Sequence, residues 1–216
     1  MNRPAAGSTD STRERIVSAA TAEFARYGIA GARIERIAKA AKTSKERVYA
    51  YFSSKEALYS HVASQELAAV AEATRLDPAD LPGYAGRIHD YFTAHPERLR
   101  LMTWGQLELL GGDCEPRADD PIGRSAEGKV KQLRDAQLAG SLDPAWDPLD
   151  ILVLVNRIAM SWAAQPEMAP RDEELRSAFL TDRRAAIVAA VQRLFPAYAS
   201  KAGEGDPDPG AAMPRG

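Results

Sequence analysis

Apolar residues recur at helical spacing along nearly the whole chain, and this periodicity is the strongest constraint on its fold. Ile16, Ala20 and Phe24 recur four residues apart until Gly28 ends the run, and a second, shorter run covers residues 34–41. Spacings of three and four place side chains on one face of a helix. The pattern therefore predicts a succession of amphipathic helices.

One segment could be taken for a strand. The run ILVLV at 151–155 is apolar throughout and could by itself be a buried strand. The apolar positions continue to Ile158, Ala159 and Trp162, which favours a helix, and no second strand-like run is present to pair with it. We therefore expect an all-α fold with about nine helices.

Helix boundaries are indicated by capping boxes, prolines and glycines. Three pairs fit a capping box: Ser11 with Glu14, Thr43 with Glu46, and Ser53 with Glu56. They predict a first helix from Ser11, a short helix of about seven residues from Ser44, and a longer one from about 54 to 75. Further helices are expected over 96–111, 148–164 and 171–195, and the polar, Pro- and Gly-rich segment 197–216 is expected to be disordered.

The two parts of the chain differ in charge. Residues 1–60 carry eleven Lys or Arg and six Asp or Glu, whereas the remainder carries 17 basic and 24 acidic residues. A basic amino-terminal piece joined to an acidic body suggests an anionic partner for the smaller piece alone. A chance fluctuation of solvated charges is the alternative explanation.

Several functional classes have no signal in the sequence. No apolar run is long enough to cross a membrane, and MNRPAAGSTDSTRER lacks the apolar middle of a signal peptide, so a cytoplasmic protein is expected. Cys114 is the single cysteine, and His61, His89 and His95 show no metal-ligand spacing. The sequence shows no nucleophile–base pair and no phosphate-binding loop. We therefore expect that the protein is not an enzyme and binds no metal or cofactor.

The stretch TSKERVYAYFSSKEAL, Thr43 to Leu58, concentrates cations and phenols around two helix starts. Three short helices with a turn at AKTS are typical of a helix-turn-helix, whose second helix enters the major groove of DNA. Val48 and Phe52 stand four apart and can face a core with Ile37, which leaves Lys45 and Tyr49 on the opposite face. This face is predicted to reach base edges.

These residues also carry a resemblance to a known family. Residues 34–62, IERIAKAAKTSKERVYAYFSSKEALYSHV, resemble the DNA-binding domain of the TetR family of bacterial repressors, whose pattern runs I-A-x-x-A-G-V-S-x-x-x-[LIV]-Y-x-[YH]-F-x-[SN]-K-[ED]-x-L. Lys42 and Thr43 replace the usual Gly-Val of the turn, and Arg33 stands where a Thr commonly caps the second helix. The matching positions are Ile37, Ala38, Ala41, Ser44, Val48, Tyr49, Tyr51, Phe52, Ser54, Lys55, Glu56 and Leu58.

The resemblance implies a three-helix DNA-binding domain at 10–60 and a helical-bundle domain at 61–196 that binds a small molecule and dimerises. It implies a homodimer on a palindromic double-stranded DNA operator, joined through the helices around 150–162 and 172–195. The helix over 54–75 would be the lever between the domains. The expected DNA-binding residues are Arg33, Ser44, Lys45, Glu46, Arg47, Tyr49, Tyr51 and Lys55.

The ligand-binding residues are expected among aromatic, apolar and polar side chains of the larger domain, because ligand sites in helical domains are largely apolar with a few polar groups. The candidates are Tyr84, Tyr91, Met102, Trp104, Glu108, Asn156 and Trp162, and core packing or surface exposure is the alternative for each.

The function that follows is sequence-specific transcriptional repression relieved by a small-molecule effector. Two alternatives stay open at this point: an all-helical small-molecule-binding protein, and a helix-turn-helix module that docks protein. The operator, the effector and the regulated genes cannot be read from the sequence.

Overall fold

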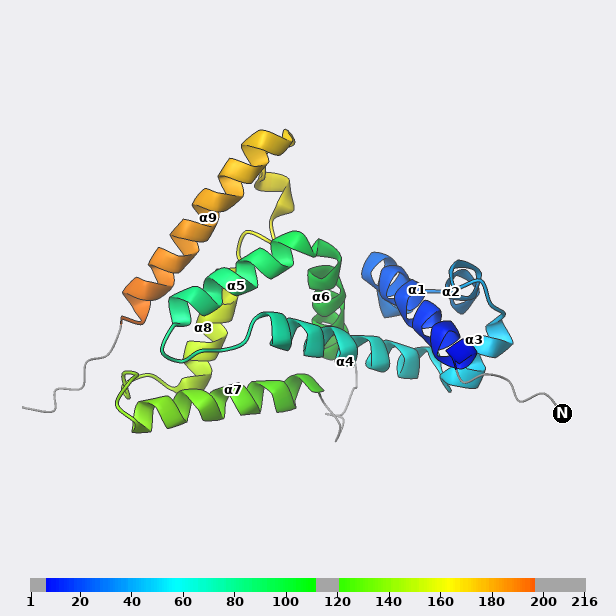
Figure 1. Ribbon diagram of the computed structural model, residues 1–216, viewed down its shortest axis with the longest axis horizontal. Helices are drawn as coiled ribbons and strands as arrows, with labels where there is room; N and C mark the ends of the chain where they lie inside the picture. The colour runs from blue at the N-terminus through cyan, green and yellow to red at the C-terminus, as the bar shows by residue number, and fades with distance from the viewer. Residues whose placement is uncertain (1–6, 112–120, 197–216) are drawn as a thin grey trace, which may run out of the picture.

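The computed structural model of the chain describes residues 7–111 and 121–196, and within them every regular element is a helix, as expected. Figure 1 shows an elongated molecule with a small head formed by the first three helices and a larger helical body. The predicted tail, 197–216, lies outside the described residues. The elements are α1 (Gly7–Gly31), α2 (Ile34–Ala40), α3 (Lys45–Tyr51), α4 (Lys55–Ala73), α5 (Leu81–Ala94), α6 (Pro96–Gly111), α7 (Pro121–Leu138), α8 (Pro148–Met160), the 3₁₀ helix η1 (Pro166–Met168) and α9 (Glu173–Leu194).

The observed helix starts and capping residues differ from the predicted ones by one to a few residues. Helix α1 begins at Gly7, so Ser11 lies inside it and does not cap it. Ser44 and Ser54 cap α3 and α4, one residue later than Thr43 and Ser53. Each capping serine has an extended backbone, and its hydroxyl accepts a hydrogen bond from the N–H three residues on, which is the geometry that a cap requires.

The head has its own core. The buried residues of α1, α2 and α3, among them Ile16, Phe24, Ile37 and Val48, pack in one cluster that Phe52 joins from the start of the next turn. Leu58 and Val62 of α4 belong to the same cluster, so the core of the head extends past residue 60. Arg15 also donates from Nε to the carbonyl oxygen of Ala41 (3.1 Å), which ties α1 to the turn before α3.

Helix α6 joins the head to the body. Leu101 is buried in the head core, and Tyr59 Oη donates to the Leu101 carbonyl oxygen at 3.4 Å. Gly28 interrupts α1 with φ of 65°, and a Cβ there would lie 2.9 Å from the Trp104 ring. A residue with a side chain would both strain this backbone and collide with the indole, so glycine permits the close approach of α1 to α6.

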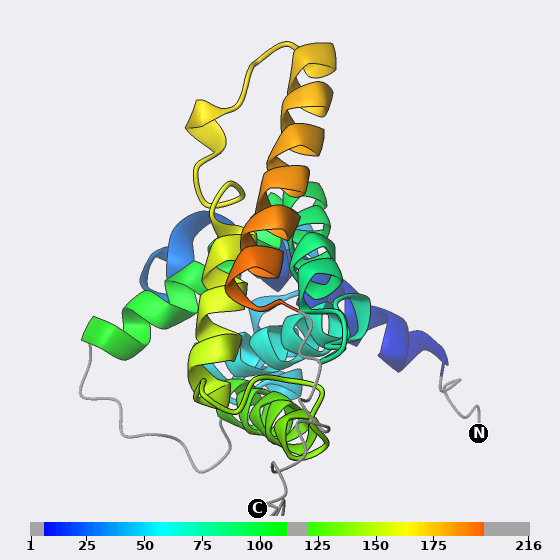
Figure 2. The same cartoon turned by 90° about the vertical axis from the view of Figure 1, so that its left-hand side faces the viewer.

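The body is built around α5, which packs against α4, α6, α8 and α9. Helix α7 packs on α8 and α4, and Figure 2 shows α8 and α9 lying side by side. The body core contains Tyr84, Phe92, Leu133, Val155 and Val191. The apolar run at 151–155 lies in α8, which confirms the predicted helix, and Ile151, Leu152 and Val155 face this core.

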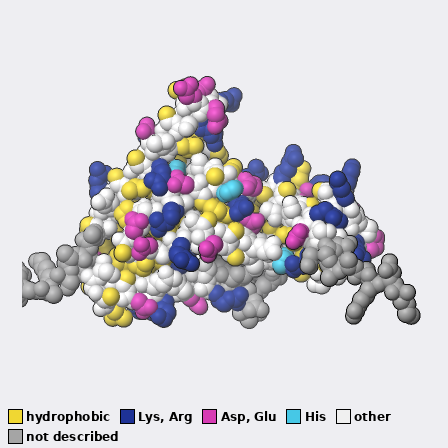
Figure 3. Space-filling view, in the orientation of Figure 1, with side chains coloured by type: hydrophobic (Ala, Val, Ile, Leu, Met, Phe, Trp, Pro, Cys, Tyr) yellow, Lys and Arg dark blue, Asp and Glu magenta, His cyan; other side chains and the backbone are white. Residues whose placement is uncertain are grey.

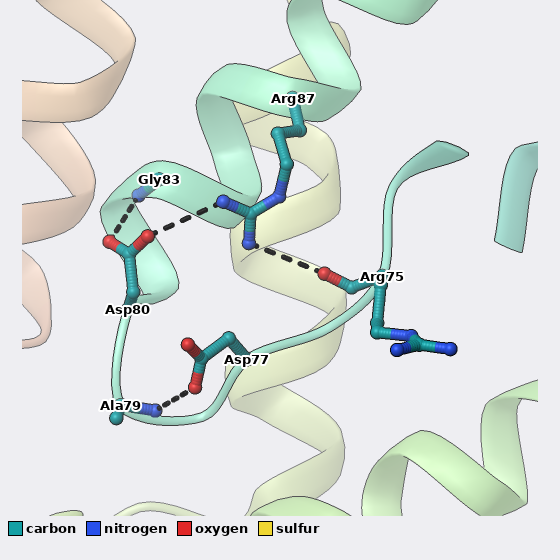
Figure 4. Close-up of polar contacts among 6 residues, drawn as sticks. All are labelled: Arg75, Asp77, Ala79, Asp80, Gly83 and Arg87. Atoms are coloured by element: carbon teal, nitrogen blue, oxygen red, sulfur yellow. Dashed lines mark hydrogen bonds and ion pairs between the residues drawn. The ribbon is translucent and has the colours of Figure 1, made fainter. Parts of the chain in front are cut away.

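Polar contacts hold the turn between α4 and α5 (Figure 4). Asp80 Oδ1 accepts from the N–H of Gly83 at 2.8 Å and caps α5, and Asp77 Oδ1 accepts from the N–H of Ala79 at 2.9 Å. Arg87 reaches back to Asp80 Oδ2 (3.4 Å) and to the Arg75 carbonyl oxygen (3.3 Å). These bonds fix the turn that connects α4 to α5.

None of the helices in the described ranges, 7–111 and 121–196, is long and apolar enough to span a membrane. The described residues also contain no cluster of three or more His, Cys, Asp or Glu that could hold a metal ion. Cys114 lies outside the described residues.

The turn between α2 and α3 stores backbone strain. Lys42 has φ of 53°, the left-handed conformation that glycine adopts without penalty and other residues avoid. We expect Lys42→Gly to raise the free energy of unfolding by about 0.5 kcal/mol, because relief of the strain exceeds the extra entropy of a glycine in the unfolded chain. Lys39→Gly, in the helical last turn of α2, should lower it by about 1 kcal/mol.

Denaturant unfolding of the two variants and the parent chain measures both changes. Equal destabilisation by the two glycines would show that the left-handed turn carries no strain.

Candidate functional site

The first candidate surface is α3, which the head core holds by one face. Val48 is the buried residue of α3. Phe52, which follows α3, and Ile37 of α2 are buried in the same core. Lys45, Arg47 and Tyr49 are exposed, and 43% of the Tyr49 surface is open to solvent. The helix therefore presents long polar side chains outward from a fixed base, as the sequence predicted.

Cations gather on this end of the molecule. Figure 3 shows Lys and Arg side chains projecting from the head, while the visible face of the body mixes both charges. The head is thus suited to an anionic surface.

Lys45 is paired across the turn. Its Nζ donates to Glu35 Oε1 of α2 at 2.5 Å, and this hydrogen bond raises the pKa of Lys45 and lowers the pKa of Glu35. Both side chains are exposed, so salt screens the pair and it adds little stability. A phosphate or a base acceptor can therefore draw Lys45 away from Glu35 at small cost.

Three of the predicted DNA-binding residues surround one hollow. Arg33, Tyr49 and Lys55 line an open hollow of about 400 Å³ between α2, α3 and the start of α4. Arg33 stands at the N-cap of α2, but its guanidinium has only N–H donors and cannot accept a capping bond, while its backbone N–H donates to Glu23 Oε1 at 3.0 Å. The Arg33 guanidinium is therefore not committed to the cap.

Ser44, Glu46 and Tyr51 are engaged within the head. The Ser44 hydroxyl caps α3, and hydrogen bonds from the Glu46 N–H and the Ser44 hydroxyl lower the pKa of the Glu46 carboxyl. The guanidinium of Arg47 lies over the Tyr51 ring at 5.7 Å. Glu46 is thus held at the start of α3, but by Ser44 and not by the Thr43 of the predicted capping box.

The second candidate site is a cavity in the body. A cavity of about 130 Å³ lies between α4, α5, α6, α7 and α8. Its wall is largely apolar, with Val70, Ile88, Phe92, Met102 and Met160 among the lining residues. Apolar cavities with a few polar groups are the usual form of a small-molecule site.

Three polar side chains meet in the cavity. Tyr84 Oη donates to Asn156 Oδ1 at 3.1 Å and accepts from Lys129 Nζ at 3.1 Å. Burial raises the pKa of Tyr84 to about 12, so the phenol stays neutral, and burial lowers the pKa of Lys129. The cavity therefore holds a hydrogen-bonded cluster with one partly buried cation.

The predicted ligand residues divide between this cavity and other places. Tyr84, Met102 and Asn156 line it, whereas Tyr91, Trp104 and Trp162 do not. Tyr91 stacks edge-on with Phe92 and lies beside Arg98, Trp104 packs on Gly28, and Trp162 packs edge-on against Phe179 of α9. These three aromatics fill helix contacts, and the side chain of Glu108 lies outside those that the structure describes.

Comparison with known families decides between the possible assignments of this two-part architecture. Residues 16–62 match the family of bacterial regulatory proteins of the tetR family, and residues 80–193 match the tetracyclin repressor-like C-terminal domain. The chain belongs to the TetR family. The resemblance seen in residues 34–62 is thereby confirmed, and the TetR family membership extends to the body.

Individual proteins that match this chain are also transcriptional regulators. The chain is 39% identical over 159 residues to the HTH-type transcriptional repressor SCO4008 of Streptomyces coelicolor, covering 74% of this chain and 81% of the relative. It is 32% identical over 182 residues to the HTH-type transcriptional regulator RutR of Escherichia coli (strain K12), covering 79% and 81%. The structure is similar to that of the transcriptional regulator SCO4942 of Streptomyces coelicolor, with 55% identity, a TM-score of 0.73 and coverage of 86% and 99%.

Sequence reasoning missed Lys129 as a cavity residue of this TetR chain. Ala126, Val130 and Leu133 are apolar at helical spacing and face the body core. Lys129 lies three residues after Ala126 and four before Leu133, so it shares their buried face. A cation on the apolar stripe of α7 was the signal that could have found it.

The partly buried charge of Lys129 should cost stability in the ligand-free protein. We expect Lys129→Met to raise the melting temperature by about 2 °C or more, because the thioether fills the space without a desolvated charge. The pKa of Lys129 is lowered by burial, so this cost is present below the folded pKa and disappears as the pH rises through the ordinary lysine value of about 10.4.

Calorimetry at pH 7 and pH 10 measures the difference in melting temperature between Lys129→Met and the parent chain. We expect this difference to be smaller at pH 10. Lys131→Met is the matched control, since Lys131 is exposed on the same helix and pairs with Asp135. A lower melting temperature for Lys129→Met than for the parent chain would contradict the expectation.

Proposed function

We propose that the chain is a sequence-specific transcriptional repressor that binds an operator through its head and releases it when a small molecule fills the body cavity. The observation that carries this proposal is α3, whose buried face is held by Val48 while Lys45, Arg47 and Tyr49 stand exposed. A helix held in this way can enter a major groove without losing its position. With this function we also propose that the protein works in the cytoplasm.

The exposed residues would divide into two roles. Lys45, Arg47 and Tyr49 on α3 would contact base edges, whereas Arg33, Tyr51 and Lys55 would contact phosphates around the groove. Lys55 is the first residue of α4, where the positive end of the helix also favours a phosphate. Ser44 and Glu46 would support this surface by capping α3.

The cavity would act on the head through two helices. Leu67 and Val70 of α4 line the cavity, and the same helix begins at Lys55 beside α3. Met102 of α6 lines the cavity, and its neighbour Leu101 lies in the head core. A ligand that fits only a wider arrangement of α4 and α6 would draw the protein away from the DNA-binding shape, and DNA would weaken that ligand in return.

Selection of bound fragments from random double-stranded DNA tests the proposal directly. We expect recovery of a palindromic sequence whose affinity falls steeply between two salt concentrations. Recovery of no enriched sequence would leave the chain as a small-molecule-binding protein or a protein-docking module.

The two roles predict different mutant behaviour. We expect Lys45→Ala to cost about 1 to 3 kcal/mol on the selected operator and to relax the base preference at one position. Lys55→Ala should weaken all DNA sites alike and reduce the slope of affinity against salt by about one ion. Gel-shift titrations at several salt concentrations measure both, with Lys131→Ala, a change at an exposed lysine of α7 in the body, as the control.

An unchanged base preference in Lys45→Ala, or an unchanged salt slope in Lys55→Ala, would remove that residue from its role.

The operator-binding form is proposed to be a homodimer joined through α8 and α9. Leu149 and Val153 of α8 stand four apart with 51% and 47% of their surfaces exposed, while Ile151, Leu152 and Val155 face the core. These exposed apolar side chains lie beside the exposed Asp150 and Arg157, and cover by a partner would remove them from water. Two-fold symmetry would then place the two α3 helices about one DNA turn, roughly 34 Å, apart.

A charge on this face tests the dimer. We expect Val153→Glu to weaken self-association at least about a hundredfold, because each interface would bury an unpaired carboxylate. Leu138→Glu changes a more exposed apolar residue, on α7, and should leave association unchanged. Sedimentation over a range of concentrations gives both values, and equal dissociation constants for the two variants would place the interface elsewhere.

A further inference from the structure

We propose that the effector of the body cavity is a small organic carboxylate, bound by Lys129 as its counter-ion, with an apolar part about the size of a six-membered ring. This inference rests on the proposed function in assigning the cavity to an effector, and it goes further by naming the chemical class.

Among the described residues that line the cavity, the positive charge of Lys129 has no negative partner. Lys129 Nζ is 3.1 Å from Tyr84 Oη and 5.4 Å from the centre of the Tyr84 ring. No Asp or Glu is among the described residues that line the cavity. Lys129 therefore sits in a mostly apolar wall beside neutral partners, where a cation is stabilised only weakly.

Among the described residues, Tyr84 does not supply a negative charge to pair with Lys129. The pKa of Tyr84 is raised to about 12, and its hydroxyl proton is already donated to Asn156 Oδ1. Lys129 has three N–H donors, of which the Tyr84 oxygen accepts one. A ligand carboxylate next to Nζ would accept another and would neutralise the charge at the same time.

The size and lining of the cavity define the rest of the ligand. The volume is about 130 Å³, and an engineered apolar cavity of about 150 Å³ is known to hold benzene. Phe92, Met102 and Met160 offer flat or adaptable apolar surfaces for such a group. Because the cavity is slightly smaller than one that holds benzene, a one-ring or short-chain acid would fit only as the cavity widens, which is the change that the proposed release of DNA requires.

Two other ligand classes are distinguished by charge. An amine of the same shape would place a second cation beside Lys129. A neutral amide or ketone could accept a hydrogen bond from Nζ but would leave the charge uncompensated, so its affinity should be lower than that of the matched acid.

Calorimetric titration of the full chain without DNA tests the inference. The probes are benzoate, phenylacetate and hexanoate, each with its amide, and benzylamine. We expect at least one acid to bind about ten to a hundred times more tightly than its amide, and benzylamine not to bind. The inference is overturned if every amide binds as well as its acid, or if no acid binds.

Variants of α7 test whether the preference for an acid over its amide depends on Lys129. Lys129→Met should abolish the preference for acid over amide, and Lys129→Gln gives the same readout if the methionine variant folds poorly. Lys131→Met, on the exposed side of α7, should keep the full preference. A preference for the acid that survives in both Lys129 variants would show that another group binds the carboxylate.

The operator assay separates this inference from the proposed function. An acid that binds through Lys129 but never releases DNA would overturn the proposed repressor mechanism and leave the ligand class standing. Release of DNA by an amide as readily as by its acid would overturn the ligand class alone.

Discussion

The contact between Gly28 and Trp104 determines how the head sits on the body. The indole lies where a side chain on Gly28 would be, and the positive φ at this position turns α1 so that its last residues meet α6. Leu101, one turn earlier on α6, is buried in the head core, and Tyr59 of α4 bonds to its carbonyl oxygen. Helices α1, α4 and α6 are therefore locked at one point, and the angle between head and body depends on it.

This junction lies close to the cavity. Met102 lines the cavity one residue after Leu101 enters the head core, so α6 contacts both regions through adjacent side chains. Packed interfaces of this kind change between discrete arrangements and do not deform smoothly. A small change in the position of α6 or α4 can therefore be passed to α3 as a movement of the whole head.

The sequence predicted the fold well where local signals act alone. Periodicity identified the helices, and the segment around Tyr49 identified the exposed face of α3, because both depend on near neighbours in the chain. The caps were one residue early, since Thr43 and Ser44 are both capping residues and only the backbone decides which one is extended. The roles predicted for individual DNA-contacting residues stay predictions.

The cavity was less predictable because it depends on contacts between distant segments. Tyr84, Lys129 and Asn156 come from three helices and meet only when α5, α7 and α8 pack together. Trp104 is predicted as a ligand residue from its chemical character, and its contact with Gly28, 76 positions away, can be seen only in the folded chain.

The shared helices also limit how this protein could exchange parts with its relatives. The head core includes Val62 from α4 and Leu101 from α6, so a segment cut at residue 60 would lack two of its buried side chains. A head grafted onto another body would need an α6 that offers a leucine and an indole in the same places. If α3 reads the operator as proposed, substitution on its surface would change DNA specificity without disturbing these shared contacts, whereas transfer of the whole head would break them.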